Sequence, residues 1–241
     1  MVLFSIPSVQ TFLGKKATNY LNKTYDVGID IERIGLTYSG NVDLQNVFVK
    51  DHHQDTLLYA NGIETSILNI NEISKGNPKL GKVFIEDLTF NMKIYKDEYS
   101  DNLMTLIRKF DSKKEPSGEK FVLTTENIAI KKGRYRFTNE NLNYTKAVDY
   151  YNIDLDAESL VVDGDDIYIN IDALSFDDFR GLKVSKLKTC FSITPREMNF
   201  QELVIQTKDS DIRGEILFSY DEGGLDDFEN DVFINADFDR A

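Results

Sequence analysis

The sequence is poor in the residues on which metal and redox chemistry most often depend. Its 241 residues include one cysteine, two histidines and no tryptophan. A single cysteine excludes a disulfide framework and any metal site built only from cysteines. The chain also lacks a Gly-x-Ser-x-Gly motif, a phosphate-binding glycine-rich loop and a dinucleotide fingerprint. The sequence therefore predicts a protein that is not an enzyme and that uses no cofactor.

The two histidines are adjacent in the sequence, and acidic residues flank the pair. They are His52 and His53, with Asp51 before them and Asp55 after them. Adjacent side chains on a β-strand point to opposite faces of the sheet. No second histidine pair exists that would complete a metal site. We therefore predict a solvated hairpin tip at this position and no bound metal.

Positive charge, glycine and proline are also scarce. The chain has 28 Lys and Arg against 41 Asp and Glu, a net charge of −13, so phosphate backbones would be repelled and nucleic acid is excluded as a partner. Gly (14) and Pro (4) are too few for a low-complexity chain. Sixteen Phe and twelve Tyr exclude a disordered chain, so the composition indicates an acidic folded domain.

Long apolar runs are absent as well. The apolar segment 1–4 (MVLF) has four residues, whereas a membrane span needs roughly 20 and the apolar part of a signal peptide roughly 7 to 15. Two interpretations of this segment stay open. It is either part of an ordinary helix or the last turn of a transmembrane helix that lies upstream of this chain.

Residues 5–25 are predicted to form an amphipathic helix. Apolar residues recur in this segment at three-to-four spacing, and its charged residues are all lysines up to Asp26. One interpretation is a membrane-surface helix, because lysines meet anionic headgroups. The other is a helix that covers one end of a sheet. The candidate membrane-surface residues are Phe12, Leu13, Lys15, Lys16 and Tyr20.

Nearly everything after Asp26 alternates between apolar and polar residues with period two. This alternation is typical of strands with one apolar and one wet face. One short helix is expected to begin at Asn102, as its cap, because apolar residues then recur at helical spacing. Lys132-Gly133 and the segment 163–166 (DGDD) are predicted to be turns. The predicted fold class is all-β: a long curved antiparallel sheet, or β-groove, with an N-terminal amphipathic helix and one short internal helix.

Many strands share the pattern apolar-x-apolar-x-x-apolar-x-apolar. Clear copies start at Ile29, Val42, Val83, Ile169 and Met198, and looser copies start at Leu123, Leu155 and Leu182. The extra residue would turn the second half of each strand to the wrong face, unless a β-bulge or a tight corner absorbs it. Such devices at similar positions would curl the sheet into a trough or a partly closed barrel. A plain β-sandwich with irregular strands is the alternative.

The repeat predicts which residues would line the trough. Six apolar residues are expected to share one continuous face: Ile85, Phe90, Ile169, Ile171, Phe200 and Ile205. Such a face could solvate acyl chains, at about 0.8 kcal/mol per buried methylene. Burial in an ordinary core would produce the same alternation, so the sequence leaves both interpretations open.

The opening segment, FSIPSVQTFLGKKATNYLNKTYDVGIDIERIGLTYSGNVDLQNVFVK (residues 4–50), resembles the start of periplasmic TamB-like proteins of the AsmA-like group. The resemblance continues through segments 55–60 and 88–92, and through 174–176 with 180–182. It covers essentially the whole chain, but only the N-terminal part of such a protein. Most of its specificity lies in the first 60 residues.

The resemblance implies a fold and a function. TamB-like proteins form a long β-sheet rolled into a groove with an apolar inside. They span the periplasm from the inner membrane to an Omp85-type outer-membrane partner, TamA or a related lipoprotein. They are implicated in outer-membrane protein assembly and in the movement of phospholipids between membranes. The implied function of this chain is a segment of such a bridge, which carries or shields lipid.

The same resemblance implies an organisation, a location and partners. Residues 1–25 would be an amphipathic helix at the end of an upstream inner-membrane anchor, and residues 26–241 the first part of the groove. The location would be periplasmic. The partners would be phospholipid acyl chains, the inner membrane through that anchor, and an Omp85-type protein through a C-terminal part beyond residue 241. The alternative function is a chaperone-like scaffold that assists outer-membrane proteins by strand addition.

Overall fold

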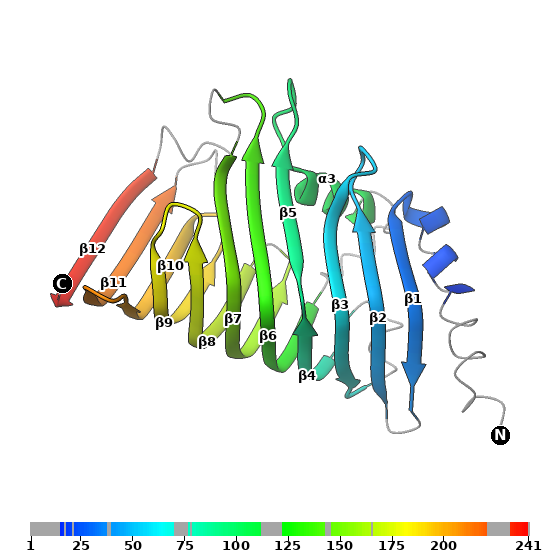
Figure 1. Ribbon diagram of the computed structural model, residues 1–241, viewed down its shortest axis with the longest axis horizontal. Helices are drawn as coiled ribbons and strands as arrows, with labels where there is room; N and C mark the ends of the chain where they lie inside the picture. The colour runs from blue at the N-terminus through cyan, green and yellow to red at the C-terminus, as the bar shows by residue number, and fades with distance from the viewer. Residues whose placement is uncertain are drawn as a thin grey trace.

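The computed structural model describes residues 15–16, 18–20, 22–37, 40–69, 77, 79–111, 122–142, 146–164, 166–220 and 232–240. These residues form one twelve-stranded sheet, which confirms the all-β prediction (Figure 1). The strands are β1 (Gly28–Leu36), β2 (Asn41–Lys50), β3 (Thr56–Ile67), β4 (Lys79–Glu86), β5 (Thr89–Ile94), β6 (Val122–Asn139), β7 (Lys146–Asp163), β8 (Asp166–Asp178), β9 (Lys183–Ile193), β10 (Glu197–Gln206), β11 (Asp211–Tyr220) and β12 (Val232–Arg240).

The strands follow one another across the sheet nearly in chain order. The order is β1-β2-β3-β4-β6-β7-β8-β9-β10-β11-β12, and β5 pairs with β3 and β6. Neighbours are antiparallel except that β6 runs parallel to β4 and β5, which departs from the predicted antiparallel sheet. Parallel neighbours need a long crossover connection, and the 95–121 segment between β5 and β6, which contains helix α3 (Asn102–Asp111), provides it.

The repeat has two adjacent spacer residues at its centre (the x-x of apolar-x-apolar-x-x-apolar-x-apolar), and the backbone is irregular at several of them. Six described non-glycine residues in the strands or in the short β4–β5 link have a positive φ: Asn46, Asp87, Lys132, Asn152, Ser159 and Glu202. Four of them are the second spacer residue of a repeat copy, at φ angles between 50° and 55°. In the copy on β10, the register against β9 and β11 shifts beside Glu202. Irregular backbone is therefore present at four of the predicted positions, and there it keeps the apolar residues before and after the spacer on one face.

Small buried residues lie next to these bulges. Ala60 is 0% exposed, Ala157 4% and Thr189 1%. The Thr189 hydroxyl donates a hydrogen bond to the Gln201 carbonyl (2.8 Å), which lies beside the bulge at Glu202. Side chains converge on the inside of a bend, so small side chains fit there. Figure 1 shows the long central strands bending so that the sheet curves into a trough, rather than lying flat.

Helical residues between 15 and 25 precede β1, and helix α3 follows β5. Helical residues between 15 and 25 approach β1, where the Asn22 amide donates to the Ile29 carbonyl (2.7 Å) and accepts from the Ile29 N–H (2.9 Å). This helix therefore meets one edge of the sheet. Lys15, Lys16 and Tyr20 are exposed, whereas the predicted positions of Phe12 and Leu13 fall outside the described residues. Within the described part of the chain, no helix has the length and apolarity needed to cross a membrane.

Two local predictions are wrong. The cap of α3 is Asp101, whose Oδ1 accepts from the Met104 N–H (2.8 Å), because the Asn102 side chain is used elsewhere. Asn102 Oδ1 accepts from the Lys93 N–H (2.9 Å). Lys132-Gly133 is not a turn but lies in the interior of β6, because the left-handed Lys132 produces a bulge instead of a chain reversal.

Candidate apolar trough

Cross-strand register aligns apolar residues in a row that spans ten strands. Directly opposite residues share a face of the sheet, and each residue of the row faces the next across a strand pair. Ile85 and Ile205, two of the predicted groove residues, belong to this row. Its members are Ile34, Leu44, Ile63, Ile85, Ile130, Leu155, Leu174, Leu187, Ile205 and Ile212.

The other four predicted residues lie in neighbouring rows of the same face. Ile169 is opposite Phe191, which is opposite Phe200. Ile171 lies two residues from Ile169, so both point the same way. Phe90 follows Ile85 across the Asp87 spacer. The structure therefore brings all six predicted residues to one face, in several adjacent rows instead of one line.

Aromatic rings form two ladders on this face. In the first ladder, ring centroids are 5.8 Å apart between Phe90 and Tyr135, 6.3 Å between Tyr135 and Tyr150, and 4.6 Å between Tyr150 and Phe176. In the second, the distances are 4.9 Å between Phe191 and Phe200 and 6.1 Å between Phe200 and Phe218. Tilted rings at these separations attract one another beyond their area burial. The ladders therefore stiffen the apolar wall, and the sequence pattern did not single out Tyr135 and Tyr150 as members.

The apolar face is incompletely covered. All six predicted residues are half-buried, and ten apolar side chains are buried among the described residues. The buried set includes small residues beside the bulges, such as Ala60 and Ala157. Water therefore reaches much of the face that the rows form.

The opposite face carries many charged and polar side chains. On β8, Asn170 and Asp172 alternate with Ile169 and Ile171 and are exposed. On β6 and β7, Lys131 Nζ lies 3.6 Å from Asp156 and 3.9 Å from Asp154, across the strand pair. Exposed pairs of this kind contribute little stability, but they keep this face in water.

Buried carboxylates border the apolar rows at one end of β7 and β8. Asp149 is 2% exposed and accepts two hydrogen bonds from Arg134, from Nε (2.9 Å) and from an η nitrogen (2.8 Å). Asp178 is also 2% exposed, and Arg180 donates to it through its side chain and its backbone N–H. Both donors hold the pKa of Asp178 below its usual value. Asp178 is directly opposite Tyr150, so this end of the apolar face carries a charged pair, whereas Asp149 follows the alternation to the other face.

Residues that could hold a metal lie outside the trough. His52 and His53 are in the turn between β2 and β3, not on a strand, so alternation does not separate them, and both approach Glu98. The prediction that they point to opposite faces is therefore wrong. Sequence reasoning missed Glu98 because it is 45 residues from His53.

No protein-family model matches this chain, and a search of curated proteins finds no match either.

Proposed function

We propose that the apolar trough binds phospholipid acyl chains and that its role is not catalytic. The observation that carries this proposal is the apolar row across ten strands, whose predicted groove residues stay half-buried. A continuous apolar surface of this extent is unfavourable in water and marks a binding surface. An acyl chain lying on it would gain about 0.8 kcal/mol for each methylene removed from water.

The place of this binding in the cell rests on the resemblance to TamB-like proteins. We propose that the chain is one segment of a periplasmic bridge between the inner membrane and an Omp85-type outer-membrane partner. The row crosses the strands, so it runs along the length of the sheet. That direction suits transport of lipid from one end of the sheet to the other. Lys15, Lys16 and Tyr20 are exposed on the helix before β1, where an anionic membrane surface would attract the lysines.

Photocrosslinking with a matched pair of variants tests the proposal. Ile171→Asp places a charge on the apolar face, and Tyr168→Asp places one on the opposite face of the same strand, where Tyr168 is 44% exposed. Both variants are incubated with vesicles that contain a phospholipid with a photoreactive acyl chain. We expect Ile171→Asp to stay folded and lose most crosslinking, and Tyr168→Asp to keep it. Equal crosslinking of the two variants would contradict the proposal.

Thermal unfolding of the same variants distinguishes a trough from a sealed core. On an open wall the new carboxylate at residue 171 can reach water. In a closed core it would be costly enough to unfold a domain with about 5 to 15 kcal/mol of stability. An unfolded Ile171→Asp chain, together with wild-type protein that carries no phospholipid in native mass spectrometry, would refute acyl-chain binding.

Exposed apolar side chains on β12 favour strand addition as a second candidate function. Phe233 is 68% exposed, Ile234 63% and Phe238 48%, and β12 pairs only with β11 among the described strands. An exposed apolar edge strand is a template for another strand. Peptides from outer-membrane β-strands should then protect β12 amides from hydrogen exchange. A Phe233→Lys, Phe238→Lys variant should lose that protection, and unchanged protection would exclude this function.

A further inference from the structure

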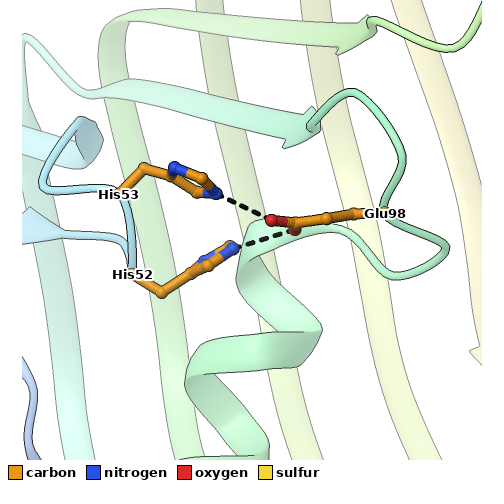
Figure 2. A group of neighbouring side chains, drawn as sticks. All are labelled: His52, His53 and Glu98. Carbon is orange, nitrogen blue, oxygen red and sulfur yellow. Dashed lines mark hydrogen bonds and ion pairs between the residues drawn. The ribbon is translucent and has the colours of Figure 1, made fainter.

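The β2–β3 turn brings two imidazoles together above one carboxylate. Nε2 of His52 lies 2.9 Å from one carboxylate oxygen of Glu98, and Nε2 of His53 lies 2.7 Å from the other. Figure 2 shows both rings directed toward Glu98, which belongs to the connection between β5 and α3. The three donor atoms of this cluster lie within 4.8 Å of one another. Residues 45 and 46 positions apart in the sequence therefore converge on one point.

The turn has the conformation that this convergence needs. Asp51 Oδ1 accepts hydrogen bonds from the backbone N–H groups of His53 and Asp55, each at 3.0 Å. Gln54 takes a left-handed φ of 68°, so the chain reverses within a few residues. The side chains of His52 and His53 consequently leave the turn on one side instead of alternating.

Tyr95 holds the two imidazole rings. Its ring stacks on His53 at 3.8 Å with an interplanar angle of 28°, and it meets His52 edge-on at 5.4 Å and 81°. The Tyr95 hydroxyl lies 2.7 Å from Asp51 Oδ2 and 2.9 Å from Asp55 Oδ2, and the two carboxylates share its one donor hydrogen. Tyr95 is 7% exposed and Asp51 4%. The rings are thus supported by buried neighbours and are not free to rotate as surface histidines are.

We propose that His52, His53 and Glu98 bind a divalent transition metal, with Zn²⁺ as the representative ion. Two imidazole nitrogens and one carboxylate oxygen are the donors that such ions prefer, whereas Ca²⁺ and Mg²⁺ prefer oxygen ligands throughout. Ligand bonds of about 2.0 to 2.2 Å to a tetrahedral ion would place the donors somewhat over 3 Å apart. The nitrogen–oxygen contacts of 2.9 and 2.7 Å would open by roughly half an ångström, and donors as far apart as the 4.8 Å limit of the cluster would move closer together.

The charge and exposure of the cluster suit an ion that enters from solvent. The hydrogen bonds from His53 and His52 hold the pKa of Glu98 below its usual value, so Glu98 is a carboxylate at neutral pH. The side chains of His53 and Glu98 are 45% and 33% exposed, and that of His52 is 19% exposed. Three protein ligands leave a fourth position for water.

A bound ion would join two connections of the fold. The β2–β3 turn carries both histidines, and Glu98 lies three residues before the Asp101 cap of α3. The metal would therefore fix the start of α3 against β2 and β3, in addition to the Asn102–Asp51 hydrogen bond (2.9 Å). We expect slower hydrogen exchange at the first turn of α3 when Zn²⁺ is present.

Zinc titration of the untagged, chelator-treated chain tests the proposal, because His52 and His53 are its only histidines. Calorimetry should give one Zn²⁺ per chain, and the nitrogen NMR resonances of both imidazoles should shift together. Glu98→Gln should weaken binding by roughly tenfold or more. Asp97→Asn is the matched control and should bind as the wild type does, because it removes the neighbouring carboxylate at an exposed left-handed position that asparagine tolerates.

Three results would overturn the proposal. They are no binding at millimolar Zn²⁺, binding that leaves the imidazole resonances unchanged, and equal affinity in the Glu98→Gln and Asp97→Asn variants. If circular dichroism shows that Glu98→Gln does not fold, the imidazole resonances of the wild-type chain still show whether Zn²⁺ binds to the two histidines. Mg²⁺ and Ca²⁺ should leave those resonances in place, and equal shifts with all three ions would also exclude a transition-metal site.

Discussion

The left-handed backbone of the repeat spacers predicts how substitutions at Glu202 change the stability of the protein. This residue lies in β10 with φ 50°, and it is exposed. A left-handed backbone costs an ordinary residue about 1 to 2 kcal/mol, and a β-branched residue more. Glycine has no such cost but loses roughly 0.5 to 1 kcal/mol through the entropy of the unfolded chain. We therefore expect Glu202→Gly to be close to neutral and Glu202→Val to destabilise the protein.

The expected difference between these two variants is about 2 kcal/mol, with the glycine variant the more stable. For a domain of this size, that corresponds to about 4 to 8 °C in melting temperature. Glu64 is the matched control, because it is an exposed glutamate in β3 whose φ is not positive. At Glu64 the order should reverse, and the valine variant should be more stable than the glycine variant by about 1 kcal/mol.

Thermal and urea unfolding of the four variants measure these differences. The sign of the stability difference at each position decides the test, and this sign does not depend on the absolute stability of the protein. If Glu202→Val is as stable as Glu202→Gly, the spacer does not need a left-handed residue. The link between the doubled spacer and the curvature of the sheet would then be refuted.

Two further predictions concern buried polar groups. Asn102 is 1% exposed, and its amide donates to Asp51 Oδ2 and to the Asn91 carbonyl. Asn102→Ala should therefore lower the free energy of unfolding by about 2 to 4 kcal/mol in urea titrations. A change below about 1 kcal/mol would show that water replaces these hydrogen bonds. Arg180 lowers the pKa of Asp178 from its ordinary value of 3.8, so the stabilisation that Asp178 gives the folded protein is present above pH 3.8 and is lost as the pH falls through the lower, folded-state pKa. The Asp178→Asn variant should therefore lose stability less steeply below about pH 4 than the wild type. An unchanged slope would contradict this assignment.

Much of the trough could be predicted from the sequence, because side-chain alternation is a local property of a strand. The period of two assigns each residue to a face, and the doubled spacer before Leu174 or Leu203 is visible in the sequence. The pattern does not show which spacers become left-handed. Ser159 and Glu202 do, whereas the spacer between Ile171 and Leu174 shifts register without a positive φ.

What the sequence alone determined is therefore the fold class, the apolar face and some of the places where the strands bend. Tertiary structure decided the features that depend on residues far apart in the chain. The parallel pairing of β6 follows from the path of the α3 crossover. The exposure of Ile171 depends on how far the trough closes. The alternation of apolar and polar residues along a strand contains no information about that closure. The convergence of His52 and His53 on Glu98 needs the β2–β3 turn and the β5–α3 connection side by side, and a local pattern carries no information about that distance.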